Sequence, residues 1–269
     1  MNDDSGVDLA MDRAHSARMY DFYLGGITNF PADRETAVQA LQAFPAAPIA
    51  ARINRRFMHR ATRCAAAELG IRQFLDIGTG IPTSPNLHEV AQQQAPASRV
   101  VYADNDPIVL AHAQALLRSH SDGTTAYLQA DARDADSILT HPTLTGALDF
   151  NRPIALSLIA LLHFLSDDDA RTAVDRLKAA LPSGSTLAIS HATPDFDPEG
   201  VARVTATYAR AGTSVRARAR DEIERFFGGW EILEPGLVPT RHWRPDPDDP
   251  TGTTTDAEAS TYAALARKP

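Results

Sequence analysis

The chain has 269 residues, of which 43% are hydrophobic and 22% are charged, and its formal net charge is −8. This composition is typical of a globular protein with a sizeable core. So acidic a chain is a poor candidate for general nucleic-acid binding, which needs a basic face. A single cysteine, Cys64, excludes an internal disulfide. There is no apolar run of about 18 residues, as a membrane span requires, and the acidic N-terminus lacks the apolar core of a secretory signal. We therefore expect a cytoplasmic protein.

The first 70 residues are predicted to be helical, apart from residues 1 to about 14, which we expect to be disordered. A short helix comes first, Gly25 and Gly26 break it, and a second helix begins near Pro31. A third helix ends at Gly70. Its apolar residues recur at every fourth position: Ile49, Ile53, Phe57 and Ala61.

From residue 71 onward, short apolar segments alternate with helical segments. The predicted strands lie within residues 72–78, 98–104, 125–131, 152–165 and 184–192, and the predicted helices within 84–95, 106–120 and 166–181. Ser84, followed by Pro85, is the expected N-cap of the first of these helices, and Asp106, followed by Pro107, that of the second. The alternation predicts right-handed crossovers and a doubly wound, mostly parallel α/β sheet.

Beyond residue 192 the pattern predicts a helix and then two strands, Trp230–Glu234 and Thr261–Ala266. A polar, proline-rich loop separates the two strands. We expect them to close one edge of the sheet as an antiparallel hairpin.

Acidic residues end three successive predicted strands: Asp76, Asp104 and Asp131. Ligands of an open parallel sheet bind outside the carboxyl ends of its strands, so these side chains are expected at one edge. Gly78 and Gly80 allow a tight turn and a close approach to a ligand. Asp104 follows Gly80 by 24 residues, the separation at which an acid after the second strand meets a ribose in nucleoside-binding folds.

The glycine loop departs from the dinucleotide fingerprint G-x-G-x-x-G. Thr83 occupies the position of the third glycine, and Pro82 precedes it. That glycine opens the helix whose N-terminus holds a pyrophosphate, so its absence disfavours NAD. S-adenosylmethionine has no pyrophosphate, and its ribose and ammonium groups suit an acidic edge.

Three short motifs follow the first three strands: Asp-Ile-Gly-Thr-Gly, Tyr-Ala-Asp-Asn-Asp-Pro and Gln-Ala-Asp-Ala-Arg. They resemble the first three motifs of class I S-adenosylmethionine-dependent methyltransferases. Residues 17–37, 74–92, 100–117 and 234–246 more narrowly resemble a bacterial family of predicted class I methyltransferases, formerly known as a domain of unknown function. The resemblance extends from about residue 12 to residue 267.

The resemblance implies S-adenosylmethionine as the cofactor and eight residues that bind it. In chain order they are Asp76, Gly78, Thr79, Gly80, Asp104, Asn105, Asp131 and Ala132. The first four would lie beside the methionine part of the cofactor, the next two at the ribose and the adenine ring, and the last two at the adenine edge. Pro82 departs from the family pattern, in which a third glycine is common.

The N-terminal segment has two interpretations. Arg18, Tyr20 and Tyr23 either belong to an ordinary helix or lie over the cofactor as a lid, with Gly25 and Gly26 as its hinge. A lid of this kind excludes water from the reaction.

His163 and His191 follow the fourth and fifth strands and are the candidate general bases. Positioning alone is the alternative, because alignment can suffice for methyl transfer. His242 is a further candidate near the substrate, and the histidine spacing predicts no metal site. Arg210, Arg216, Arg218 and Arg220 form either a solvated helix face or a patch that favours an anionic acceptor.

The sequence therefore predicts a class I methyltransferase fold in one domain over residues 1–269. Residues 1–70 form an N-terminal helical cap, residues 71–192 the cofactor-binding core, and residues 193–269 a C-terminal helix with antiparallel edge strands. The predicted activity is methyl transfer from S-adenosylmethionine to a small-molecule acceptor, with neither a membrane nor nucleic acid as partner. The alternatives are an NAD(P)-dependent oxidoreductase and a nucleoside-binding sensor without catalysis.

Overall fold

The computed structural model describes residues 11–116, 118–249 and 252–269. Most of the segment predicted to be disordered, residues 1–10, lies outside this range. The described chain forms an eight-stranded sheet in the order β3-β2-β1-β4-β5-β8-β6, with β7 also paired to β8. The strands are β1 (Gln73–Ile77), β2 (Arg99–Asp104), β3 (Thr124–Gln129), β4 (Ala155–Ile159), β5 (Thr186–Ala192), β6 (Glu231–Ile232), β7 (Val238–Pro239) and β8 (Thr261–Arg267).

The first five strands are parallel, and β8 pairs antiparallel with β5, β6 and β7. This arrangement confirms the predicted doubly wound sheet with antiparallel edge strands. Two details of the edge differ from the prediction. The strand expected at Trp230–Glu234 is shortened to Glu231–Ile232, and β7 was not predicted. The prediction left the order of the edge strands open, and β8 lies between β5 and β6.

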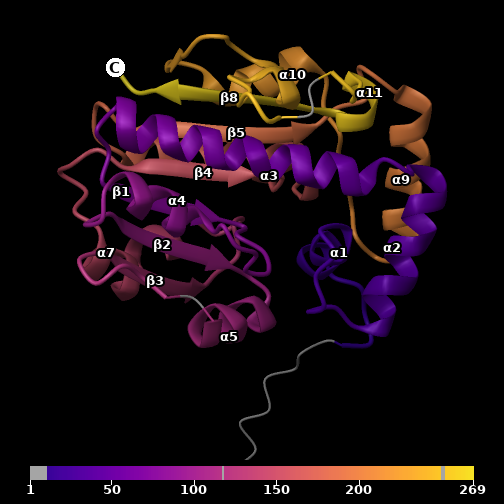
Figure 1. Cartoon of the computed structure of the whole chain (residues 1–269), viewed down its shortest axis with the longest axis horizontal. Coiled ribbons are helices and arrows are strands. Elements are labelled where there is room, and N and C mark those ends of the chain that lie inside the picture. The colour runs from indigo at the N-terminus through magenta and orange to yellow at the C-terminus, as the bar shows by residue number, and fades with distance from the viewer. Residues whose placement is uncertain (1–10, 117, 250–251) are drawn as a thin grey trace, which may run out of the picture.

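The helices alternate with the strands and cover both faces of the sheet (Figure 1). They are α1 (Ser16–Tyr23), α2 (Pro31–Ala43), α3 (Ala47–Arg63), α4 (Leu87–Gln94), α5 (Pro107–Leu116), α6 (Ala135–Thr140), α7 (Pro142–Ala147), α8 (Asp167–Ala180), α9 (Pro198–Arg210), α10 (Arg220–Glu224) and α11 (Asp256–Ala259). Short helical turns join them: η1 (Cys64–Glu68), η2 (Leu162–Phe164), η3 (Arg225–Phe227) and η4 (Thr240–His242). The sequence pattern did not predict α6, α7, α9 or α11, the last of which lies in the segment that was expected to be a loop.

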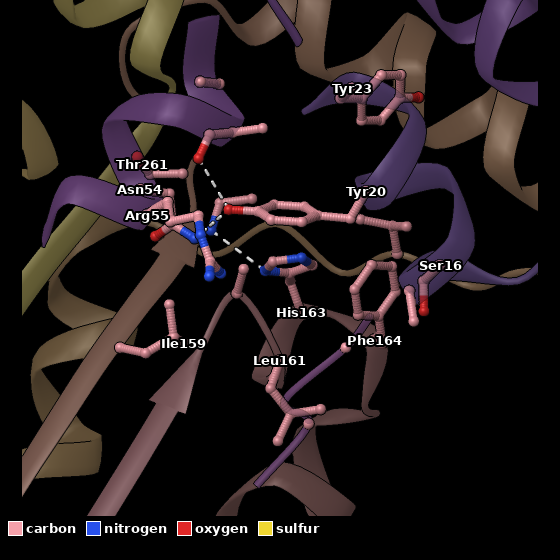
Figure 2. A pocket seen from close by; sticks show the side chains of 18 of the residues that line it. Ser16, Tyr20, Tyr23, Asn54, Arg55, Ile159, Leu161, His163, Phe164 and Thr261 are labelled. Atoms are coloured by element: carbon pink, nitrogen blue, oxygen red, sulfur yellow. Dashed lines mark hydrogen bonds between the residues drawn. The ribbon is translucent and has the colours of Figure 1, made fainter. Parts of the chain in front are cut away.

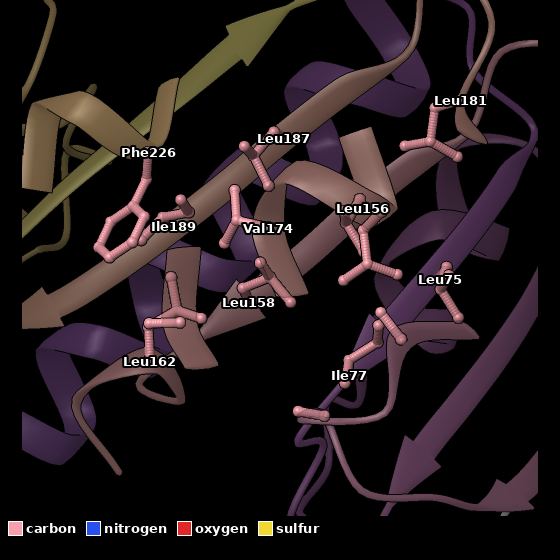
Figure 3. Packing of buried hydrophobic residues seen from close by; sticks show 14 of the residues in the cluster. Leu75, Ile77, Leu156, Leu158, Leu162, Val174, Leu181, Leu187, Ile189 and Phe226 are labelled. Atoms are coloured by element: carbon pink, nitrogen blue, oxygen red, sulfur yellow. The ribbon is translucent and has the colours of Figure 1, made fainter. Parts of the chain in front are cut away.

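The main core lies between the sheet and α8, where side chains from neighbouring strands interdigitate (Figure 3). Leu75 of β1 stands beside Val101 of β2 and Leu156 of β4 in register. All five residues of β1 are buried, because helices cover both faces of a parallel sheet. On the opposite face, α3 lies across β4, β5 and β8, and its Phe57 contacts the buried Trp243 edge to face.

Helices α1, α2 and α9 gather at the end toward which the parallel strands point (Figure 1). They share an apolar cluster in which Met19 and Ala37 pack with Val204 and Tyr208 of α9. The predicted N-terminal helical cap is thus present, and α9 completes it. The cap covers the edge of the sheet where a ligand is expected.

The predicted N-cap of α5 is confirmed, since Asp106 Oδ1 accepts the backbone N–H of Ile108 at 2.9 Å. The predicted N-cap of α4 is wrong. Asn86 precedes that helix, which begins at Leu87, and Asn86 forms a capping box with Glu89. Glu89 is the capping-box partner that favours Asn86 over Ser84.

Candidate active site

A cavity of about 270 Å³ lies between the cap and the carboxyl ends of β1, β2 and β4. The loop after β1 and the end of β2 line one part of it. The helices α1, α3 and α9 line the rest, together with the turn after β4 and residues 259–261. Figure 2 shows side chains of the cap and of the sheet edge facing one another across this space.

The loop after β1 owes its shape to two glycines. Gly78 and Gly80 have φ angles of 73° and 68°, which disfavour other residues. A Cβ on Gly78 would stand 2.6 Å from a methyl carbon of Leu161, so the loop also needs the missing side chain for close packing. Both glycines and Thr79 between them line the cavity, as expected from the sequence.

Asp104 at the end of β2 connects this loop to the next one. Its Oδ2 accepts the backbone N–H of Gly80, and its Oδ1 accepts that of Asp106, each at 2.9 Å. Each carboxylate oxygen keeps a second lone pair for a ligand. Asp104 and the neighbouring Asn105 both line the cavity.

Asp76 lies on the floor of the cavity and is only 7% exposed. Burial raises its pKa to about 7, although a hydrogen bond from Thr79 and the charge of Arg55 oppose this effect. Burial raises the pKa of Asp104 as well. A cationic ligand group at this end would favour the ionised form of both carboxyls.

Arg55 of α3 is a cavity residue that the sequence analysis missed. One of its terminal nitrogens donates to the carbonyl of Pro85 at 2.9 Å. Its buried Nε has no hydrogen-bond partner within the described parts of the chain. Burial lowers the pKa of the guanidinium, and the charge of Asp76 partly opposes this shift. The apolar period of α3 marks Ile53 and Phe57 as buried, but it gives no sign that Arg55 faces a cavity.

Two of the three predicted lid residues reach the cavity. The Tyr20 hydroxyl donates to the carbonyl of Ala51 at 2.9 Å and accepts a hydrogen bond from Asn54 at 3.0 Å (Figure 2). The Tyr23 hydroxyl lies 3.2 Å from that of Tyr208 on α9. These contacts place α1 against α3 and α9.

Arg18 does not line the cavity. It is 2% exposed, and its guanidinium pairs with Asp33 at 3.2 Å and with Asp106 at 3.7 Å. Arg18 therefore joins α1 to α2 and to the start of α5. A buried arginine held by two carboxylates is fixed in place and is not free to cover a ligand.

The two candidate bases occupy different positions. His163 lines the cavity, and burial together with the charge of Arg218 lowers its pKa to about 4. His191 is fully buried and does not line it. Its Nδ1 lies 2.8 Å from the carbonyl of Ala192 and its Nε2 lies 2.9 Å from Nη1 of Arg218, so both ring nitrogens are occupied.

The remaining candidates lie outside the cavity. Asp131 pairs with Arg133, which lowers the pKa of Asp131, and neither Asp131 nor Ala132 lines the space. His242 is exposed and contacts Asp256 at 3.1 Å.

The four candidate arginines do not form one surface. Arg210, Arg216 and Arg220 are exposed, but Arg218 is buried, because residues 213–219 form an extended segment and not the helix that the solvated-face interpretation requires.

Within residues 11–116, 118–249 and 252–269, no three His, Cys, Asp or Glu side chains are grouped as a metal site would require. Among the described helices, none has the length and apolar character needed to cross a membrane.

A family model described as S-adenosyl methyltransferase matches residues 3–269. A Streptomyces avermitilis protein of the DUF574 family has a solved structure that is 50% identical to this chain, with a TM-score of 0.94 over 97% of this chain and 100% of that one. A Thermobifida fusca structure named as a putative methyltransferase is 40% identical, with a TM-score of 0.90 over 97% of each chain. A Mycobacterium ulcerans protein named "Putative S-adenosyl-L-methionine-dependent methyltransferase" is 27% identical over 232 residues, 76% of this chain and 72% of that protein. The chain belongs to this S-adenosyl methyltransferase family, whose cofactor is S-adenosylmethionine.

Proposed function

We propose that this enzyme transfers the methyl group of S-adenosylmethionine to a small molecule bound beneath the cap. The observation that carries the proposal is the continuity of the cavity, which joins the acidic loops at the sheet edge to an apolar chamber under α1 and α9. The cofactor supplies an electrophilic methyl on its sulfonium. The family match and the missing third glycine both favour this function over an NAD(P)-dependent oxidoreductase.

The charged end of the cavity fits the cofactor. Asp76 is buried with a raised pKa and would gain an ionic partner in the α-ammonium group. The partnerless Nε of Arg55 would donate to the carboxylate of the same amino-acid moiety. Asp104 would accept the ribose hydroxyls, and Asn105 would lie beside the adenine. A role for Asp131 and Ala132 at the adenine edge remains a prediction from the resemblance.

The other end of the cavity suits an uncharged acceptor skeleton. Aromatic and aliphatic side chains line it, and its polar groups include the paired hydroxyls of Tyr23 and Tyr208. The apolar residues that line this end of the cavity include Phe44, Phe164, Val201, Val204 and Val215. Such a chamber excludes water and holds a small acceptor in line with the methyl group, which is the main requirement of a displacement reaction.

The test is calorimetric titration of the full chain with S-adenosylmethionine and S-adenosylhomocysteine, with NAD as the comparator. We expect binding of both sulfur compounds and none of NAD. Binding of NAD alone would overturn the proposal in favour of the oxidoreductase. A sensor without catalysis would bind both compounds and form no S-adenosylhomocysteine with any acceptor in a screen of small alcohols, phenols, carboxylic acids and amines.

A further inference from the structure

The ring of His163 has one nitrogen engaged by the protein and one open to the cavity. Its Nδ1 accepts the backbone N–H of Ala192 at 3.5 Å. No hydrogen bond to Nε2 occurs within the described parts of the chain, and the side chain lines the cavity beneath Tyr20 (Figure 2). In a neutral imidazole, one nitrogen accepts and the other carries the proton. A ring that accepts at Nδ1 therefore carries its proton at Nε2, on the cavity side.

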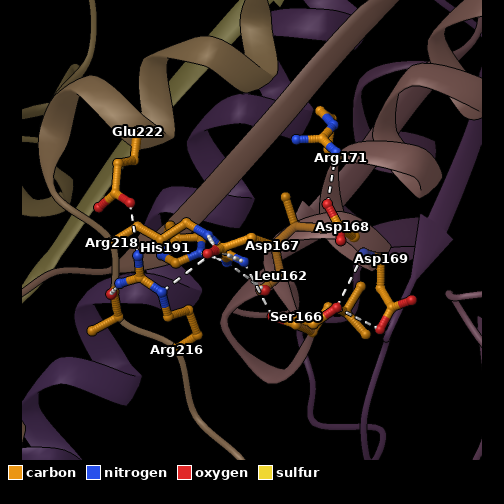
Figure 4. A network of polar contacts seen from close by, with 12 residues as sticks. Leu162, Ser166, Asp167, Asp168, Asp169, Arg171, His191, Arg216, Arg218 and Glu222 are labelled. Carbon is orange, nitrogen blue, oxygen red and sulfur yellow. Dashed lines mark hydrogen bonds and ion pairs between the residues drawn. The ribbon is translucent and has the colours of Figure 1, made fainter.

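Arg218 and His191, which lie together in Figure 4, anchor the end of β5 that carries this backbone N–H. Nη1 of Arg218 donates to Nε2 of His191 at 2.9 Å, because a guanidinium can only donate. The proton of His191 must then sit on Nδ1, which donates to the carbonyl of Ala192 at 2.8 Å. The N–H of Ala192, which donates to Nδ1 of His163, belongs to the preceding peptide unit. A backbone N–H can only donate, so this one bond places the proton of His163 on Nε2, and the contacts of His191 and Arg218 hold the donor in position.

Arg218 is itself held firmly in place. It is 2% exposed and also donates to the carbonyls of Leu162 and Leu165, at 2.9 and 3.1 Å. Asp167 pairs with it at 2.9 Å. The backbone N–H of Arg218 bonds the carbonyl of Ala192 at 3.1 Å, so the extended segment that carries Arg218 lies directly against the end of β5.

The charges around His163 keep its ring neutral. Arg218 is the nearby cation, and Asp167 and the exposed Arg216 pair with each other behind it at 3.4 Å. His191 faces His163 edge to face, with ring centroids 5.5 Å apart, and burial lowers the pKa of both histidines, that of His163 to about 4. Tyr20 faces His163 from the cap (Figure 2).

From this geometry we propose that His163 acts as a hydrogen-bond donor that orients the methyl acceptor, and that Arg218 and His191 are positioning residues, which anchor the carbonyl of Ala192 and so keep the N–H of Ala192 against Nδ1 of His163. The inference rests on the proposed function of the cavity. A ring with its proton on Nε2 cannot remove a proton through that atom. The lone pair of the acceptor then forms the bond to the methyl carbon, and the sulfur keeps the electron pair of the broken carbon–sulfur bond. Any proton on the acceptor stays on the methylated product, which loses it to bulk water on leaving the chamber and not to His163.

The test is the tautomer of His163, which nitrogen NMR reads directly. The full chain is labelled with 15N-histidine, and the spectrum of its nine histidines is recorded near neutral pH with S-adenosylhomocysteine. The variant His163→Gln identifies the resonances of His163 by their loss. We expect a protonated Nε2 and an unprotonated Nδ1. A proton on Nδ1, or on both nitrogens, would overturn the proposal.

Substitution of Arg218 tests the positioning role. In Arg218→Met the end of β5 loses an anchor, so the N–H of Ala192 should move away from Nδ1 and His163 should show a mixture of the two tautomers. Arg218→Lys, which keeps a charged donor to His191, should restore most of the Nε2–H form. Arg216→Met is the matched control, because Arg216 is an exposed neighbour, and it should leave the tautomer unchanged. A folded Arg218→Met variant with an unchanged tautomer would refute the positioning role.

Circular dichroism shows whether Arg218→Met folds. If it does not, the wild-type spectrum still tests the tautomer of His163, and Arg218→Lys still tests the positioning role of Arg218. Calorimetry with S-adenosylhomocysteine on the same samples separates the two proposals. Absence of binding contradicts the proposed function, whereas the tautomer of His163 contradicts or supports the inference.

Discussion

The two ends of the cavity are built in different ways. At the sheet end, Asp76, the loop from Gly78 to Gly80 and Asp104 come from two adjacent strands and the turns that follow them. At the cap end, Tyr23 and Tyr208 meet from positions 185 residues apart in the chain. One end is charged and is shaped by the backbone. The other is mainly apolar and is shaped by the packing of helices.

The proposed function assigns one task of a methyltransferase to each end. The sheet end offers carboxylates and tight turns that match a cofactor with fixed charges and hydroxyls. The cap end offers apolar surface and two tyrosine hydroxyls, which can select an acceptor by shape. Substitutions at the sheet end should therefore lower the affinity for the cofactor, and substitutions at the cap end should leave that affinity nearly unchanged.

The largest effect is expected for Asp104→Ala. The variant loses the proposed hydrogen bonds to the ribose. It also loses the carboxylate oxygen that accepts the backbone N–H of Gly80. Charged hydrogen bonds of this kind are worth about 2 to 3 kcal/mol, so affinity for S-adenosylhomocysteine should fall about 100-fold. Calorimetry measures the change.

Asp136→Ala is the matched control, because Asp136 is exposed and pairs with Arg176 outside the cavity. Its effect on affinity should stay below about threefold. If the two variants weakened binding equally, the assignment of the cofactor to the Asp104 side of the cavity would be wrong.

Arg55→Met should have the next largest effect, and it should depend on the ligand. Loss of a charged donor to the cofactor carboxylate should weaken S-adenosylhomocysteine binding about 10- to 30-fold. 5′-Methylthioadenosine lacks the amino-acid moiety, so its affinity should not change. Arg52→Met, an exposed position on the same helix, serves as the control. Equal losses for both ligands would show that Arg55 merely supports the cavity.

The sequence predicts the two ends unequally, for physical reasons. The sheet end follows from local signals, because strand alternation and a glycine turn place Asp76 and Asp104 at one edge whatever the rest of the chain does. The cap end depends on contacts between α1, α3 and α9. Those contacts have no local period, so α9 and the role of Arg55 were missed.

Arg218 shows the same limit. In the sequence it stands among arginines of a polar stretch, and only the extended path of residues 213–219 buries it against His191. By contrast, Arg18 lies in a helix that was predicted, yet its ion pairs with Asp33 and Asp106 could not be inferred from helical spacing. Buried arginine side chains are therefore the feature of this molecule that its sequence pattern reveals least.

The charge at the sheet end should also make cofactor affinity depend on pH. Asp76 has a pKa raised to about 7 by burial, and pairing with the α-ammonium group would lower it in the complex. Below its pKa the free enzyme thus holds a proton that binding must release, so affinity should rise by up to about 15-fold between about pH 5.5 and 7 and should level off by about pH 8. Calorimetric titrations of wild type and Asp76→Asn with S-adenosylhomocysteine across this pH range check the expected dependence. The Asn variant should bind more weakly and lose the slope, and a slope retained in that variant would assign it to another group.

The smallest effect is expected at the cap end, where Tyr23 and Tyr208 share a hydrogen bond. Burial raises the pKa of Tyr23 to about 12 and that of Tyr208 well above its usual value, so both hydroxyls stay protonated and act by hydrogen bonding. Tyr208→Phe should lower the free energy of unfolding by about 1 kcal/mol and change the affinity for S-adenosylhomocysteine by less than about twofold.

Because the two hydroxyls are partners, the double variant Tyr23→Phe with Tyr208→Phe should cost no more than either single change. Urea unfolding of the three variants measures this coupling, and calorimetry on the same samples measures cofactor affinity. Additive losses of stability would mean that each hydroxyl has another partner. A large loss of cofactor affinity in any of the three would remove the distinction between the two ends, because the acceptor chamber would then also hold the cofactor.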